Sequence, residues 1–133
     1  MSYTETAATD DLNTLRENVN EGLRTARFLN VTSKTAAFTA LDGETSSSAH
    51  DVYLCDATSA AFAVTLPPPT DADPAAGRVV TFKKTDASAN AVTVTPDDVG
   101  ETIDGATSYP LSSQYDFVTI ISDGSVWHIV GSS

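Results

Sequence analysis

The sequence has little basic charge, one cysteine, one tryptophan and no long apolar run. It holds 7 Lys and Arg residues against 18 Asp and Glu residues, which gives a formal net charge of −11. A nucleic-acid backbone must be met by Lys and Arg, and anionic membranes attract the same residues. We therefore expect neither nucleic acid nor an anionic membrane as a partner. A strongly acidic surface with few lysines stays soluble by self-repulsion, which favours a halophilic source.

The single cysteine and the absence of long apolar stretches exclude further classes of protein. Cys55 has no second cysteine to pair with, so no disulfide forms within the chain, and its place in "VYLCDA" predicts a buried thiol. No apolar stretch approaches the roughly 18 residues of a membrane helix, so we expect no membrane insertion. The start, "MSYTETAATDD", lacks the basic and apolar regions of a secretory signal. We expect synthesis in the cytoplasm without a signal peptide, followed by retention there or assembly into something larger.

Residues 10–30, "DDLNTLRENVNEGLRTARFLN", are the one segment with helical spacing. Asp10 or Asp11 can cap the helix. A three-four spacing places six apolar residues on one narrow stripe, the predicted helix seam: Leu12, Leu15, Val19, Leu23, Ala26 and Leu29. A helix of about 20 residues with so narrow a stripe is marginal alone. We expect it to pack in a seam between like helices or in a groove on another protein; packing on its own β-domain is the alternative.

After Asn30 the helical spacing ends, and Thr, Ser, Val and Ala dominate. "VTSKTAAFTAL" can be a strand or an extended connector. From His50 on, short alternating segments stand between clusters of turn residues: "DVYLCDA", "FAVTLP", "RVVTFKKT", "AVTVTP", "ETIDG", "SYPLS", "DFVTIIS" and "VWHIVG". The sequence predicts a mainly β fold, an antiparallel, jelly-roll-like β-sandwich or barrel, preceded by one N-terminal α-helix. We expect a helical attachment or oligomerisation segment at 1–30, a connector at 31–49 and the β-sandwich domain at 50–133.

The chain ends in "YDFVTIISDGSVWHIVGSS", where two apolar runs flank an Asp-Gly pair. Asp123-Gly124 is a strong signal for a two-residue hairpin turn, because both central positions of a type I′ turn need positive φ. That turn places Ile120 opposite Trp127 and Thr119 opposite His128. Side chains alternate between the faces of a strand. The face expected in the core carries Val118, Ile120, Trp127 and Ile129.

The other face of this predicted hairpin is also mostly apolar, although a lone sandwich would place polar residues there. The residues after His50 contain no helical pattern that could cover it. Another copy of the same chain is the simplest cover, so the sequence predicts a homo-oligomer. The predicted oligomer interface consists of Phe117, Thr119, Ile121, Val126, His128 and Val130.

Residues that could carry chemistry are few. The two histidines, His50 and His128, have no metal-ligand spacing, and neither a nucleophile elbow nor a phosphate-binding loop is present. "PDDVGETIDG" gathers four carboxylates, Asp97, Asp98, Glu101 and Asp104. Calcium could bind there, but the spacing matches no EF-hand loop. We expect these four residues to be turn residues on a solvated acidic surface. We therefore expect no enzyme and no cofactor; calcium is the alternative. Tyr109 and Tyr115 are candidates for stacking on a glycan.

Three stretches carry a resemblance to a known class of β-domain: "VYLCDATSAAFAVTLPPP", "GRVVTFKKTDASANAVTVTP" and "GETIDGATSYPLSSQYDFVTIISDGSVWHIV". Their course runs through a strand ending in Asp-Ala, a strand ending in Thr-Leu-Pro and a Gly-Arg to Lys-Lys strand. A Thr-Val-Thr strand, "ETIDG" and a hairpin with an aromatic after its turn follow. Over about 80 residues, from Asp51 to Val130, the chain resembles β-domains of tailed-virus structural proteins, of phages or archaeal viruses, including tail fibres, spikes and capsid-surface proteins.

The resemblance implies a non-enzymatic virion surface domain that is often trimeric, and an N-terminal segment that attaches it to another virion protein. It also implies contact with the host surface, for which a glycan is a candidate ligand. A tail fibre usually has a longer shaft, and this chain is short and very acidic. A capsid decoration or turret protein is therefore the alternative to a tail fibre. Five copies would suit a position at a capsid vertex. Two other classes stay open: a free carbohydrate-binding module using Tyr109, Tyr115 and the acidic loop, and a small glycan-degrading enzyme.

Overall fold

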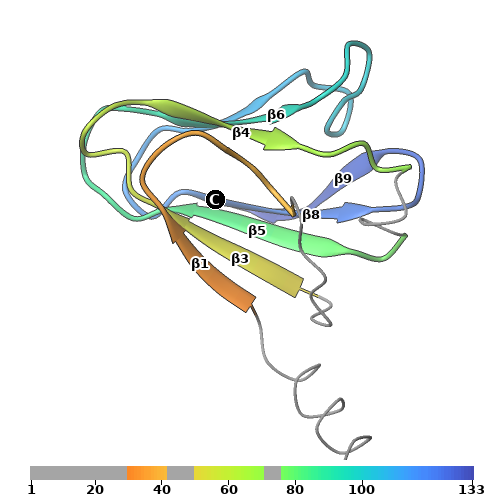
Figure 1. The fold of residues 1–133 in the computed structure, drawn as a ribbon, viewed down its shortest axis with the longest axis horizontal. Helices are drawn as coiled ribbons and strands as arrows, with labels where there is room; N and C mark the ends of the chain where they lie inside the picture. The colour runs from red at the N-terminus through yellow and green to blue at the C-terminus, as the bar shows by residue number, and fades with distance from the viewer. Residues whose placement is uncertain (1–29, 42–49, 71–75) are drawn as a thin grey trace, which may run out of the picture.

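The computed structural model describes residues 30–41, 50–70 and 76–133, and these form two β-sheets that face each other (Figure 1). Sheet A has the strand order β1-β3-β5-β8-β9, with β1 at Asn30–Lys34, β3 at His50–Cys55, β5 at Val79–Lys84, β8 at Phe117–Ser122 and β9 at Trp127–Ser132. Sheet B has the order β2-β4-β6-β7, with β2 at Phe38–Thr39, β4 at Phe62–Leu66, β6 at Val92–Pro96 and β7 at Tyr109–Leu111. The predicted mainly β fold is confirmed. The predicted helix seam and residues 10–29 of the predicted helix lie outside the described residues, whereas Asn30, its expected last residue, begins β1.

The prediction of antiparallel sheets is wrong, because both sheets are mixed. β1, β3 and β5 are parallel, and so are β2, β4 and β6; the antiparallel pairs are β5–β8, β8–β9 and β6–β7. From β1 to β6, each strand lies in the sheet opposite to its predecessor. Every second strand therefore returns beside an earlier one in the same direction. The chain coils through three turns of this kind, and β7, β8 and β9 then close the two sheets.

The first of these turns occupies part of the segment that the sequence left open between strand and connector. β1 pairs in register with β3, from Asn30 beside Asp51 to Lys34 beside Cys55. β2 pairs with β4 through Phe38 beside Val64. The strand alternative for "VTSKTAAFTAL" is therefore the correct one over β1 and β2. These residues extend sheet A and sheet B by one strand each.

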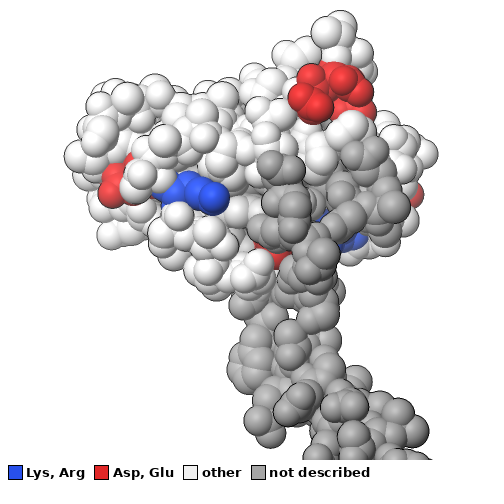
Figure 2. Space-filling model, in the orientation of Figure 1, with Lys and Arg blue, Asp and Glu red and all other residues white. Residues whose placement is uncertain are grey.

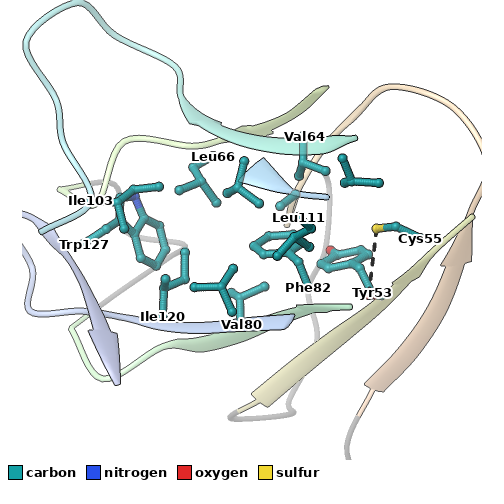
Figure 3. Packing of buried hydrophobic residues seen from close by; sticks show 14 of the residues in the cluster. Tyr53, Cys55, Val64, Leu66, Val80, Phe82, Ile103, Leu111, Ile120 and Trp127 are labelled. Carbon is teal, nitrogen blue, oxygen red and sulfur yellow. Dashed lines mark hydrogen bonds between the residues drawn. The ribbon is translucent and has the colours of Figure 1, made fainter. Parts of the chain in front are cut away.

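The core lies between the two sheets and is built from the inward residues of both (Figure 3). At one end Trp127 is only 1% exposed and lies near Leu66, Ile103 and Ile120. Its indole Nε1 donates a hydrogen bond of 3.1 Å to the carbonyl oxygen of Pro67. Because the ring is buried and its one polar atom is satisfied, Trp127 is a core residue, as the sequence predicts.

The other end of the core is aromatic. Phe82 stacks on Tyr53 with ring centroids 5.5 Å apart, and Phe38 lies against the same Tyr53 ring at 4.9 Å. The Tyr53 hydroxyl accepts a hydrogen bond from the backbone N–H of Leu41, whose φ is +62°. This bond holds the turn after β2 in a conformation that an L residue rarely adopts. The packing of these rings and the hydrogen bond of the Tyr53 hydroxyl thus join the first turn of the chain, β1 and β2, to the second turn, β3 and β4.

The closing hairpin has the predicted faces but not the predicted partners. Trp127 pairs with Ser122 and His128 with Ile121, so the loop has four residues instead of two. The cause is Asp123, whose Oδ1 accepts the backbone N–H groups of both Ser125 and Val126 at 2.8 Å. Lengthening the loop by two residues keeps the alternation of side chains. The inward set is therefore unchanged, and a β-bulge between Thr119 and Ile120 shifts the register farther along the strands.

Candidate functional site

The outer face of sheet A, the side turned away from sheet B, is the most unusual surface of the described chain. Alternation along the five strands directs seven apolar side chains to it: Val31, Val52, Leu54, Val79, Phe117, Ile121 and Val130. Val31 is 55% exposed and Val130 is 60% exposed, at opposite edges of the sheet; the other five are half-buried. The face is therefore apolar from its first strand to its last.

The residues of the predicted oligomer interface all lie on or beside this face. Phe117, Thr119 and Ile121 alternate outward along β8, and His128 and Val130 point outward from β9. Val126 ends the turn between the two strands and is 40% exposed. The sequence thus identified the β8–β9 part of the face. It missed the continuation over β1, β3 and β5, because these strands join the same sheet as β8 only through the coiled topology.

A row of hydrogen bonds crosses the middle of the outer face. His50 Nε2 and Thr81 Oγ1 share a hydrogen bond of 2.7 Å, and Thr81 Oγ1 lies 2.8 Å from Thr119 Oγ1. The row spans β3, β5 and β8, which are consecutive strands of sheet A. It places hydroxyl groups, which can both donate and accept, among apolar neighbours. We call His50, Thr81 and Thr119 the polar row.

His128 marks the β9 edge of the face and is held between two carboxylates. Its Nε2 lies 2.8 Å from Asp123 Oδ2, and its Nδ1 lies 3.6 Å from Asp104 Oδ1. The hydrogen bond to Asp123 raises the pKa of His128, and the hydrogen bonds that Asp123 accepts, first from Val126, lower the pKa of Asp123 to about 2. Both groups are about half exposed, so solvent screens this pair. Its structural effect is to fix the turn of the closing hairpin.

The acidic loop after β6 gathers three of the four predicted calcium ligands at one surface hollow. Figure 2 shows acidic side chains clustered on this side of the molecule. Asp97, Asp98 and Glu101 line this hollow of about 260 Å³, together with the fully exposed Val99. Asp104 is turned away from it and instead accepts the backbone N–H of Ile129. Within the described ranges, no group of three or more His, Cys, Asp or Glu side chains is placed to hold a metal ion.

The two predicted glycan-contact tyrosines lie apart from each other and from most of this loop. Tyr109 is half-buried on β7 and packs against the core. Tyr115 is 60% exposed, has the ammonium group of Lys83 5.4 Å from its ring centroid, and donates its backbone N–H to Lys84 at the end of β5. The end of β5 adjoins the start of β6, whereas the acidic loop follows the far end of β6. Tyr115 and the acidic loop are therefore at opposite ends of the sheets.

Sequence reasoning missed a buried ionic cluster at the end of β5. Lys84 is completely buried, and its Nζ lies 2.7 Å from Asp86 Oδ1. Asp86 also accepts the backbone N–H of Ala57 at 2.8 Å and the hydroxyl of Ser88. The hydrogen bond from Lys84 holds the pKa of Asp86 well below its ordinary value. A signal was present: Lys84 continues the inward alternation of Val80 and Phe82 along β5.

A second buried pair lies at the opposite end of the same strands. Asp51 is 1% exposed, and its Oδ2 lies 2.6 Å from Arg78 Nη2. Its other oxygen accepts a hydrogen bond of 3.0 Å from the side-chain amide of Asn30. One carboxylate thus connects the beginnings of β1, β3 and β5. These contacts stabilise the arrangement of β1, β3 and β5 in sheet A. We assign them a structural role and take the outer face of sheet A as the candidate site.

Comparison with known proteins adds no assignment to this geometry. No protein-family model matches the sequence, and a search of curated proteins finds no match. No helix in the described ranges is long and apolar enough to cross a membrane.

Proposed function

We propose that this chain is a non-enzymatic structural protein of a virus particle, where several copies of its β-domain are exposed on the surface. The observation that carries the proposal is the apolar outer face of sheet A in a chain with a net charge of −11. An exposed apolar face of this extent marks a site of association. The resemblance of residues 51–130 to virion surface domains supports the same function.

The proposed assembly has three copies, and five copies are the alternative for a capsid vertex. Residues 1–29 attach it to another virion protein, since β1 begins at Asn30 and the preceding sequence has an apolar stripe of its own. The protein is made in the host cytoplasm and reaches the particle by assembly. Capsid decoration or turret, and tail fibre or spike, are the two locations that this function allows.

Quantitative mass spectrometry of purified particles tests the proposal. The chain is expected at a fixed number of copies relative to the major capsid protein, in a multiple of three or five. A chain shortened to residues 30–133 keeps both sheets whole, so it should fold and yet fail to enter particles. Absence of the full-length chain from purified particles would refute the proposed function.

Host-surface glycan binding is the second candidate, and the exposed ring of Tyr115 favours it. Aromatic rings that combine an apolar face with a polar edge stack on sugars. Glycan-array binding that is lost in Tyr115→Ala and kept in Tyr109→Phe would support a glycan site at this ring. Equal binding by wild type and Tyr115→Ala would exclude Tyr115 as the contact.

A further inference from the structure

We infer that further copies of this chain cover the outer face of sheet A across all five strands, and that the polar row sets their register. The inference rests on the proposed function, since it names the surface through which the copies assemble. It extends the contact well beyond the closing hairpin, to Val31 on β1, Val52 on β3 and Val79 on β5.

Charge identifies the occupant. A second chain with a net charge of −11 is repelled by most of this molecule. Along the five described strands of sheet A, no side chain directed to the outer face is acidic. The ionisable groups directed there by these strands are His50, Lys83 and His128. Carboxylates adjoin this face only at its β9 edge, where Asp104 and Asp123 flank His128. Another acidic copy is therefore repelled less by this face than by the loop that carries Asp97, Asp98 and Glu101, to which a basic partner would be drawn.

The polar row gives this contact a defined register. A uniformly apolar face allows neighbouring copies to slide, because contacts of similar energy exist in many positions. A buried polar group that finds its partner in one position alone removes that freedom, as polar residues do in coiled coils. Thr81 and Thr119 already share a hydrogen bond, and each hydroxyl can both donate and accept, so each can also bond to a group on a facing copy. Rows from adjacent copies satisfy each other when the copies are aligned.

Sedimentation velocity on the full chain tests the surface, with three matched substitutions of exposed valines. Val31→Asp and Val130→Asp add a carboxylate at the two edges of the face, at sites that are 55% and 60% exposed within the monomer. Val99→Asp adds the same charge on the acidic loop, where the side chain is fully exposed. Far-UV circular dichroism checks that each variant folds.

The wild type is expected to sediment as an oligomer at micromolar concentration in high salt. Val31→Asp and Val130→Asp should each raise the dissociation constant by at least about tenfold, because a carboxylate is buried without a partner. Val99→Asp should leave the constant unchanged. A monomeric wild type, or an effect of Val130→Asp without one of Val31→Asp, overturns the five-strand surface. These outcomes are separate from the proposed function, which depends on the presence of the chain in particles.

Thr81→Val tests the register, because it removes a hydroxyl while keeping the branched shape of the side chain. The wild type is expected to show one copy number by mass photometry. The variant should associate with similar affinity but distribute over several copy numbers. A single copy number in Thr81→Val would overturn the role of the polar row.

Discussion

Truncation of Trp127 should unfold the protomer itself instead of merely separating copies. The indole is 1% exposed, and its Nε1 donates to Pro67. A buried aromatic side chain removes about 150–250 Å² from water, which corresponds to about 4–6 kcal/mol at about 25 cal/mol per Å². Measured Trp→Ala substitutions in cores cost about 3–5 kcal/mol, and the lost hydrogen bond accounts for about 1 kcal/mol of such an effect. We expect Trp127→Ala to lower the free energy of unfolding by about 4 kcal/mol.

Guanidinium unfolding followed by circular dichroism measures this cost, at one fixed chain concentration because association adds to apparent stability. Trp127→Phe is the matched control: it keeps an aromatic ring but loses the hydrogen bond and part of the volume, so it should cost clearly less than Trp127→Ala. In the wild type, the fluorescence of this single tryptophan should shift to the red on unfolding. A cost below about 1 kcal/mol for Trp127→Ala would refute the core position, since only an exposed or loosely packed ring can be removed so easily.

Three further outcomes follow from buried or paired groups. Cys55 is fully buried and burial raises its pKa to about 12, so its thiol should not react with a disulfide reagent at pH 8 until the protein unfolds; fast labelling of folded protein would contradict this burial. NMR titration should place the pKa of His128 above 6.5, with a fall in Asp123→Asn; the stability from this pair is full below pH 6.5 and is lost as pH rises through the folded-state pKa, and an unchanged value in the variant would disprove the pairing. Asp51→Ala removes the carboxylate that Arg78 contacts at 2.6 Å and should lower the free energy of unfolding by about 3 kcal/mol in denaturant melts, whereas a loss near zero would mean that the pair is dispensable.

Most strands could be predicted from the sequence because each is short, alternates and ends at turn residues. The predicted segment "DVYLCDA" covers β3 except for its first residue, His50, and "DFVTIIS" contains β8. The core position of Trp127 was also predictable, because a change of two residues in loop length does not alter which way a strand residue points. "ETIDG" did not form a full strand: Ile103 makes only isolated bridges, to Ala106 and to Trp127.

The sheet to which each strand belongs could not be predicted. Alternation shows that a strand has a buried face but does not show which strand lies beside it. The two sheets alternate along the chain because connections such as the one between Leu66 and Val79 carry it from one sheet to the other. For this reason the sequence identified the apolar face at β8 and β9 but could not extend it to Val52 or Leu54. The alternation along β5 indicates that Lys84 is buried, but its pairing with Asp86 depends on how the loop after β5 folds and could not be predicted.

The hydrogen bonds that join Asn30, Asp51 and Arg78 at the start of β1 affect how the domain resists a pulling force. Among the described residues, a force applied from the N-terminal side acts first on Asn30. There the side-chain amide is bonded to Asp51, and Asp51 is bonded to Arg78. Because β1 lies parallel to β3 over five residue pairs, such a force acts along the strands and loads their hydrogen bonds together in shear. Tension is then shared among β1, β3 and the start of β5 instead of peeling one edge strand away bond by bond.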